Sequence, residues 1–192
     1  MVLNRRRVTD PRDMAALAHP LRLDLLELLL VNGAMTASQA GRSLGESPSN
    51  TSWHLRKLAE HGFVRQNATG PGRARPWRII AESLSWGDDA EDSASSAALR
   101  DVALERELHL LRMALAEHSA RPQEWRDATR LTSARLWLTA AEARELGERI
   151  AALAEPYAGR LADPGSRPAD ARLVAMMSWL VPARPEQDDR TC

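Results

Sequence analysis

The stretch SPSNTSWHLRKLAEHG, residues 47–62, decides the fold of the region around it, because it contains the start and the stop of one short helix. Ser47 is a residue type that caps helix N-termini, and Pro48 suits the first helical position. Glycine commonly follows the last helical turn, as Gly62 does here. We therefore predict a helix that begins at Ser47 and ends at His61.

One side of this helix is apolar. At about 100° per residue, Thr51, Leu55 and Leu58 share a side, so we expect them to be buried. Ser49, Ser52, Trp53 and Arg56 point away from that side, with Asn50, His54 and Lys57 on the flank. This set has hydrogen-bonding groups and positive charge but no carboxylate. This mixture suits the major groove of DNA, because base edges present donors and acceptors while phosphates repel acids. The alternative is an ordinary solvated helix face. The candidate DNA-binding residues are Ser47, Ser49, Asn50, Ser52, Trp53, His54, Arg56 and Lys57.

Individual roles follow from residue type. Backbone amides near Ser49 and Asn50, at the positive end of the helix dipole, are expected to bind a phosphate. Trp53 either packs on a thymine methyl group or sugar, or covers the wing as structure. For His54 we expect a hydrogen bond to a phosphate or a capping role rather than metal binding, because no second ligand stands at metal spacing.

Three helices are predicted before residue 47. Asp10 and Pro11 start the first, which Pro20 interrupts. The second covers residues 21–31 and ends at an Asn-Gly pair. Thr36, followed three residues later by glutamine, forms a capping box that opens the third helix, which ends at Leu44.

After Gly62, residues 63–66 and 77–80 have the composition of two strands, and residues 67–76 between them predict an irregular, basic tip. Helix, helix, turn, helix and hairpin is the order of a winged helix-turn-helix domain. Arg73 and Arg75 at the tip are candidates for contact with the minor groove or backbone. The alternative is that they are solvated loop charges. Arg5, Arg6 and Arg7 are either an arm on the phosphates or an uninvolved terminus.

Three stretches resemble ArsR-type winged-helix repressors: ALAHPLRLDLL at residues 16–26, SPSNTSWHLRKL at 47–58 and EHGFV at 60–64. The resemblance covers about residues 14–84. It implies a dimeric bacterial regulator whose helix from Ser47 to Lys57 enters the major groove. The chain lacks the thiolate pairs of the metal-sensing members, and His109 with His118 lacks the carboxylate–histidine pattern of the zinc sensors. We therefore expect a member of the branch that does not sense metals, without metal or cofactor.

Charge and composition divide the chain. Residues 1–80 contain twelve basic and six acidic side chains, whereas residues 81–192 contain fourteen basic and twenty acidic ones. Such asymmetry is expected when only one domain contacts phosphates. We predict a DNA-binding domain at residues 1–84, an acidic linker at 85–97 and a C-terminal dimerisation or effector domain at 98–192. No membrane-spanning run or export signal is apparent, and the only cysteine is Cys192, so we expect a cytoplasmic protein without disulfides.

The second half begins with a predicted helix from Ala98 to His118. Its leucines recur at a 4-3-4 spacing that makes one apolar seam, which packs either on its own domain or, as we favour, on the same helix of a second copy. The expected dimerisation residues are Leu104, Leu108, Leu111 and Leu115.

A small β-α-β unit is predicted to follow. Its strands are residues 134–138 and 172–181, and its helix opens with a capping box at Thr139 and ends near Ala154. Five side chains of this half either line an effector pocket or form the core: Trp125, Trp137, Met176, Met177 and Trp179.

The overall expectation is an α+β fold, mostly α: a winged helix-turn-helix domain, a long dimerisation helix and a small β-α-β domain. We find no nucleophile elbow, no glycine-rich phosphate loop ahead of a helix, no paired acids in an apolar setting and no metal-ligand cluster, so we do not expect an enzyme. The expected function is sequence-specific DNA binding as a homodimer that represses transcription, with a small-molecule effector left open. The alternative is a winged-helix module that binds a protein and does not read DNA. Salt-dependent retention on duplex DNA separates the two.

Overall fold

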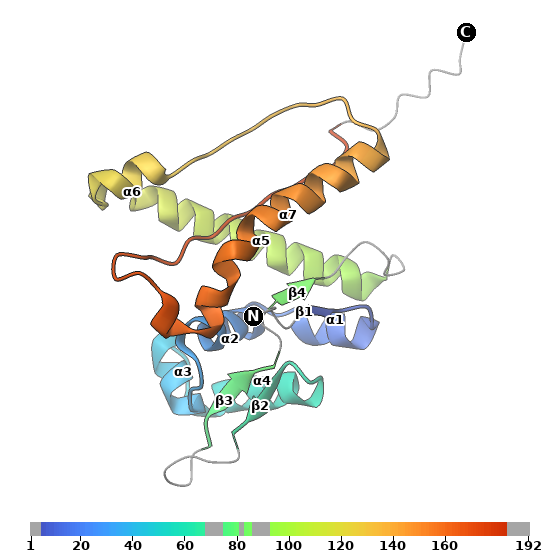
Figure 1. Cartoon of the computed structure of the whole chain (residues 1–192). Helices are drawn as coiled ribbons and strands as arrows, with labels where there is room; N and C mark the ends of the chain where they lie inside the picture. Colours follow the sequence, from blue (N-terminus) through green and yellow to red (C-terminus); the bar gives the residue numbers. More distant parts are fainter. Residues whose placement is uncertain (1–4, 68–74, 81–82, 86–92, 184–192) are drawn as a thin grey trace. The chain divides into compact units, whose positions relative to one another are not determined.

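The computed structural model describes residues 5–67, 75–80, 83–85 and 93–183. Residues within it cluster into two compact units, Met1–Arg121 and Pro122–Cys192. Figure 1 shows the chain with its helices and strands labelled.

The four helices predicted for the first unit are all present. Three of them start after the predicted caps Asp10, Thr36 and Ser47, whose side chains each accept a hydrogen bond from an amide of the first turn. The second starts at Pro20, one residue before the predicted start, and has no side-chain cap. Thr36 and Gln39 form the predicted capping box, and Ser47 accepts a hydrogen bond from the amide of Asn50 at 3.2 Å. The helices are α1 (Pro11–Leu17), α2 (Pro20–Asn32), α3 (Ala37–Leu44) and α4 (Pro48–Glu60).

The turn between α3 and α4 is tight. Gly45 ends α3 in the left-handed region at φ 71°, which favours glycine. Gly41 is buried where α3 approaches this turn. A β-carbon there would lie 2.7 Å from the carbonyl oxygen of Glu46 and 3.0 Å from the hydroxyl of Thr51. The absence of a side chain at position 41 therefore sets the spacing of α3 and α4.

The two strands predicted for the wing are present and pair with each other. Strand β2 (Val64–Gln66) pairs antiparallel with β3 (Trp77–Ile79). Met35, before α3, extends this pairing through two backbone hydrogen bonds with Trp77. Most of the predicted tip, residues 68–74, lies outside the described residues.

A second strand pair was not predicted. Strand β1 (Arg5–Arg7) runs parallel to β4 (Ser83–Ser85). Arg6 donates to Asp13 and to the carbonyl oxygen of His61 at 2.8 Å, and its guanidinium lies 4.2 Å from the centre of the Phe63 ring. The Arg6 side chain therefore fastens strand β1 to the rest of the first unit. This structural role is neither of the two that the sequence predicted for Arg5, Arg6 and Arg7.

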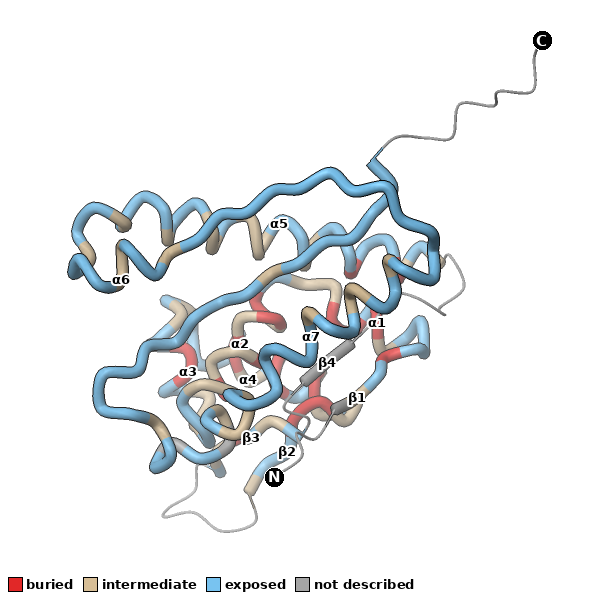
Figure 2. Tube along the Cα trace, turned by 45° about the horizontal axis from the view of Figure 1, so that its top comes forward, coloured by how far each residue is buried: buried red, intermediate tan, exposed pale blue. Residues whose placement is uncertain are grey.

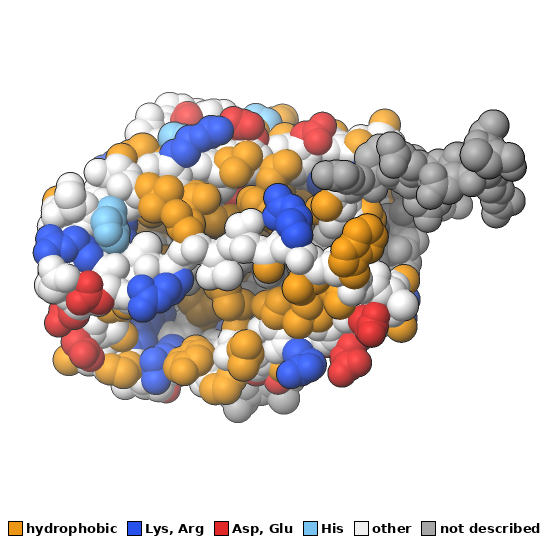
Figure 3. Space-filling model, turned by 90° about the horizontal axis from the view of Figure 1, so that it is seen from above, with side chains coloured by type: hydrophobic (Ala, Val, Ile, Leu, Met, Phe, Trp, Pro, Cys, Tyr) orange, Lys and Arg blue, Asp and Glu red, His pale blue; other side chains and the backbone are white. Residues whose placement is uncertain are grey.

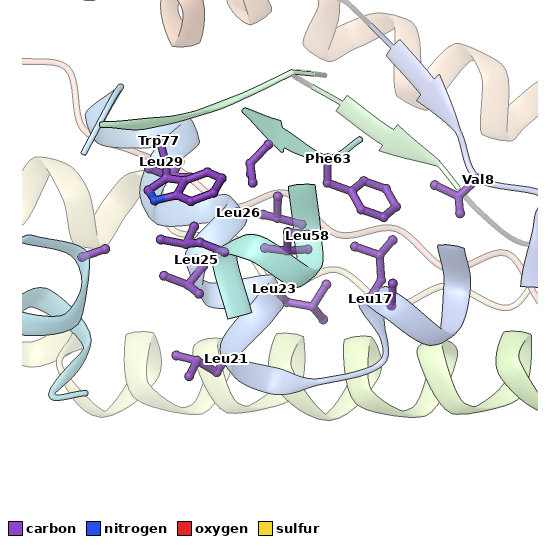
Figure 4. Close-up of a cluster of buried hydrophobic side chains, with 14 of the residues drawn as sticks. Val8, Leu17, Leu21, Leu23, Leu25, Leu26, Leu29, Leu58, Phe63 and Trp77 are labelled. Atoms are coloured by element: carbon purple, nitrogen blue, oxygen red, sulfur yellow. The ribbon is translucent and has the colours of Figure 1, made fainter. Parts of the chain in front are cut away.

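The core of the first unit collects apolar side chains from α1, α2, α4 and the wing, as Figure 4 shows. Burying these side chains removes apolar surface from water, which is the main favourable contribution to folding. The largest fully buried members are Phe63, Met14, Leu17, Leu25, Leu29, Leu55, Leu58 and Leu99.

Helix α5 (Ala94–Ala116) belongs to the first unit and is followed by a short 3-10 turn, η1 (His118–Ala120). Leu99 is fully buried against the core, and Val102 and Ala103 pack beside it. The boundary between units therefore falls after Arg121, whereas the sequence predicts a separate domain from residue 98. The reason is that the first turns of α5 cover α1 and α2. Residues 86–92 of the predicted linker lie outside the described residues.

An ion-pair network fastens α5 to α2. The mostly buried Arg106 guanidinium donates to Asp24 at 2.7 Å and also to Glu27. Burial alone would lower the pKa of Arg106, but hydrogen bonds to Glu27 and Asp24 outweigh that effect and raise it. The network gives α5 a fixed rotation on the first unit.

The second unit contains α6 (Gln123–Ala128), α7 (Ala140–Ala162) and a 3-10 turn, η2 (Pro164–Ser166). The predicted capping box at Thr139 opens α7. The helix continues beyond the expected end near Ala154 and includes Pro156. Among helices in the described ranges, none has the length and apolar character needed to cross a membrane.

The two strands predicted for the second unit are not formed. Residues 134–138 and 172–181 have no regular secondary structure and pair with no strand in the described residues, although Figure 1 shows both as drawn-out chain. Their composition favours extended backbone, but a strand also needs a hydrogen-bonded neighbour. The mostly helical α+β class is confirmed, whereas the β-α-β arrangement is wrong for the single chain.

Gly41→Ala should destabilise the first unit by about 1 to 3 kcal/mol, because the new methyl group meets the backbone of Glu46. Urea unfolding followed by circular dichroism measures the change. Ser43→Ala, at an exposed position of the same helix, is the control and should leave the midpoint nearly unchanged. Equal midpoints for the two variants would show that α3 and α4 do not need this close approach.

Candidate nucleic-acid interface

The orientation of α4 is fixed by its buried side. Thr51, Leu55 and Leu58 have no exposed surface, and the Thr51 hydroxyl donates to the carbonyl oxygen of Ser47 at 3.0 Å. The opposite side of the helix is therefore the side that faces solvent.

Most of the predicted DNA-binding residues of α4 lie on its outward side. Ser47, Ser49, Asn50 and Arg56 are exposed, Ser52 and Lys57 are half-buried, and Trp53 is 55% exposed. An indole with this exposure is placed to contact a ligand rather than to fill the core.

Local hydrogen bonds hold several of these side chains. Arg56 donates through Nε to the carbonyl oxygen of Ser52 at 3.2 Å. Asn50 Nδ2 donates to Glu46 at 2.8 Å, and Lys57 Nζ lies 2.9 Å from a carboxylate oxygen of Glu60. The outward side thus has a carboxylate at each end. At 100° per residue Glu60 lies opposite Thr51, so it belongs to this side although the expected set left it out.

The helix N-terminus offers fewer amides than expected. Ser47 uses its side chain to cap the amide of Asn50, and Pro48 has no N–H group. Within the described residues, the amide of Ser49 is left as the donor at this end of α4.

His54 does not belong to the outward face. Only 4% of its surface is exposed, and its ring centre lies 4.5 Å from that of His19 and 4.7 Å from that of Trp53. The prediction that His54 contacts a phosphate or caps a turn is therefore wrong. A helical projection places His54 on the flank, but the N-terminus of α2 covers that flank.

His19, Arg22 and His54 form a buried polar cluster. One nitrogen atom of each, His19 Nδ1, Arg22 Nε and His54 Nδ1, is shielded from solvent without a hydrogen-bond partner in the described structure. Burial lowers the pKa of both histidines, and the charge of Arg22 lowers each further, while Glu46 opposes the change. The neutral form of both imidazole rings is therefore favoured, and both rings lie beside the outward side of α4.

The wing presents cations that the sequence interpretation missed. Arg75 is exposed as predicted, whereas Arg73 lies outside the described residues. Arg65 and Arg78 are also exposed and stand directly opposite each other across β2 and β3. Strict alternation from the buried Val64 and Trp77 would have identified them.

Like charges in opposite positions of a strand pair are unfavourable for folding. The Arg65–Arg78 pair therefore makes this part of the wing electropositive at some cost to the stability of the hairpin. A polyanion would remove that repulsion.

The predicted seam of α5 is partly open. Leu104 and Leu115 are exposed, and Leu108 and Leu111 are half-buried. Among the apolar side chains of α5, those of its first turns are the ones that pack on the core.

None of the predicted effector residues is buried. Trp137, Met176 and Trp179 are exposed, and Trp125 and Met177 are half-buried. The alternative that they form a core is therefore wrong for the single chain, because the strands that would bring these side chains together are not paired. The effector pocket stays a prediction.

Comparisons with known proteins bear on the first unit. A family model described as "Helix-turn-helix domain" matches residues 17–67, and the predicted helix-turn-helix domain is therefore confirmed in this part of the chain. No curated protein matches the chain.

Two solved structures are similar. One is the homodimeric winged helix-turn-helix DNA-binding domain of Mb0332 from Mycobacterium bovis, described as a possible ArsR-family transcriptional regulator. It has 25% identity and a TM-score of 0.32, covering 56% of this chain and 78% of that one. The other is Lactococcus lactis ZitR in complex with DNA, with 15% identity and a TM-score of 0.30, covering 74% of each chain.

The two neutral histidines should make the first unit sensitive to acid. Each has a pKa below its unfolded value of 6.5, so the folded state binds protons more weakly than the unfolded state. Their contribution to stability is complete above that value and is lost as the pH falls below it. Urea midpoints measured from about pH 8 down to about pH 5 should therefore decrease.

In this experiment, His54→Gln should show a shallower decrease than the wild-type chain, because one titrating ring is gone. His109→Gln, at an exposed position of α5, is the control and should keep the wild-type slope. If His54→Gln also kept that slope, the buried cluster would not be the source of the pH dependence.

Proposed function

We propose that this chain, whose residues 17–67 form a domain of the helix-turn-helix family, is a sequence-specific DNA-binding transcriptional regulator. In this proposal α4 enters the major groove, and the wing of β2 and β3 contacts the backbone or the minor groove. The observation that carries the proposal is the burial of Thr51, Leu55 and Leu58, which turns Ser49, Trp53 and Arg56 outward.

The chemistry of the outward face fits base edges. Arginine forms paired hydrogen bonds with guanine, and asparagine does so with adenine, so Arg56 and Asn50 are the candidates for direct readout. Asn50 would exchange its bond to Glu46 for one to a base. Trp53 offers an apolar surface for a thymine methyl group or a sugar.

Phosphate contacts would come from around this face. The free amide of Ser49 lies at the positive end of the α4 dipole. On the wing, Arg65, Arg75 and Arg78 are exposed cations, and Arg73 is a further candidate by sequence. Contacts of this kind position a protein on the duplex without reading its sequence.

We further propose that the regulator acts as a homodimer and represses transcription by occupying a promoter. The partly open leucine seam of α5, from Leu104 to Leu115, is suited to pack on its counterpart in a second copy. A two-fold dimer would present two copies of α4 to half-sites of a palindrome about one helical turn apart.

Replacing Arg56 by alanine should weaken binding to the selected operator by about 1 to 3 kcal/mol, because a paired contact to guanine is lost. The urea midpoint should not change, since Arg56 is exposed. Leu55→Ala, one position away but fully buried, should instead cost about 2 to 5 kcal/mol of stability. Fluorescence anisotropy with a labelled duplex measures the affinity.

Arg144→Ala, at an exposed position of α7, is the control for arginine removal. An Arg56→Ala variant that bound the operator as tightly as Arg144→Ala would show that α4 is oriented differently on DNA.

The wing arginines should affect binding in another way. Arg65→Ala and Arg78→Ala should weaken binding to specific and random duplexes alike, and each should reduce the slope of log affinity against log salt by about 1. Titrations at several salt concentrations measure these slopes. A flat salt dependence of the wild-type chain would instead favour a winged-helix module that binds a protein.

A further inference from the structure

The polar cluster of His19, Arg22 and His54 lies where α2 packs against α4. Both helices have buried residues, shown in red in Figure 2. The His54 ring contacts the ring of Trp53, on the outward side of α4, and the ring of His19, the N-cap residue of α2. Burial lowers the pKa of both histidines and the charge of Arg22 lowers it further, so Arg22 lies close to both rings. The cluster therefore connects the N-terminus of α2 with the outward side of α4.

The nitrogen atoms of this cluster lack acceptors. His19 Nδ1, Arg22 Nε and His54 Nδ1 are shielded from solvent and have no hydrogen-bond partner among the described residues. Glu46 is the acidic residue whose charge reaches the two rings, and its carboxylate accepts a hydrogen bond from Asn50 at 2.8 Å. Three neighbouring side chains thus have an unmet need for an acceptor.

Arg22 differs in this respect from Arg106, the other arginine of the first unit that packs between helices. Both guanidinium groups lose hydration, and a buried charge normally recovers that loss through an ion pair. Hydrogen bonds to Glu27 and Asp24 compensate Arg106 and raise its pKa. Burial lowers the pKa of Arg22, and no carboxylate of the described residues opposes that change. Arg22 is therefore a half-buried cation that lacks an anion.

The N-terminus of α2 favours an anion at the same place. His19 makes no side-chain hydrogen bond to the first turn of α2, and Pro20 has no N–H group. No side chain therefore caps this end of the helix, where the helix dipole is positive. Arg22 belongs to this first turn, so its charge adds to that of the dipole.

Surface cations by themselves do not mark a phosphate site. On the face that Figure 3 shows, basic side chains, in blue, are interspersed with acidic ones, in red, which offset their charge. Arg22 has no such neighbour among the described residues. Its cluster also adjoins Trp53 and the outward side of α4. A duplex that holds α4 in its major groove would bring the phosphates bordering that groove next to the cluster.

We propose that Arg22 binds a phosphodiester group of the DNA backbone, with the rings of His19 and His54 holding its guanidinium at the border of the major groove. The Nη atoms of Arg22 are not among the shielded nitrogen atoms, so they are the groups that reach the phosphate. A planar guanidinium can pair with two phosphate oxygens at once. This inference rests on the proposed function and adds to it a contact from outside α4 and the wing.

Salt titrations of the full-length chain with the selected operator and with a random duplex test the proposal. Arg22→Met should weaken both complexes by about tenfold or more and reduce the slope of log affinity against log salt by about 1. Arg22→Lys keeps the charge but not the paired geometry, so it should retain the wild-type slope and bind more tightly than Arg22→Met. Arg100→Met, at an exposed position of α5, is the control for loss of one positive charge and should match the wild type.

Urea midpoints of the same variants distinguish a phosphate contact from a structural role. Arg22→Met should not lower the midpoint, because an apolar side chain replaces a half-buried charge that has no partner in the free protein. An arginine that stabilised the fold through a partner would lower the midpoint when replaced.

Two results would overturn the proposal: an Arg22→Met slope equal to that of Arg100→Met, or an Arg22→Met midpoint well below that of the wild type. In either case a steep wild-type slope, and loss of operator binding by Arg56→Ala, would still support the proposed function. A flat wild-type slope would overturn both.

Discussion

The rest of the first unit depends on how α4 is seated. Thr51, Leu55 and Leu58 are buried against the core, and Gly41 lets α3 approach the turn that leads into α4 so closely that a methyl group would collide with backbone. These contacts leave one rotation of α4 about its axis. Whether Arg56 and Trp53 face a ligand or the interior is decided by this packing and not by their own chemistry.

The two units differ in what holds them together. The first has a sealed core, a wing anchored by Trp77 and a helix, α5, fixed through Arg106 to two carboxylates of α2. The second has a well-formed helix but no buried side chain among those described.

Sequence alone predicted the helices of the first unit well, because Asp10, Thr36 and Ser47 are caps whose effect is local. It placed the buried stripe of α4 correctly, since helical periodicity determines it. It failed for His54 and Arg6, because their surroundings come from residues distant in sequence: His19 covers one, while Asp13 and Phe63 contact the other. Residues 134–138 and 172–181 have the composition of strands, but pairing requires a neighbour that composition does not specify.

The central claim is that the outward side of α4 lies in the major groove. Dimethyl sulfate methylates guanine N7, which is exposed in that groove, so methylation protection on a selected operator measures its occupancy directly. The account predicts guanines protected in two half-sites about one helical turn apart, with protection lost at one guanine per half-site in Arg56→Ala. Unchanged methylation of every guanine in the bound operator would contradict it.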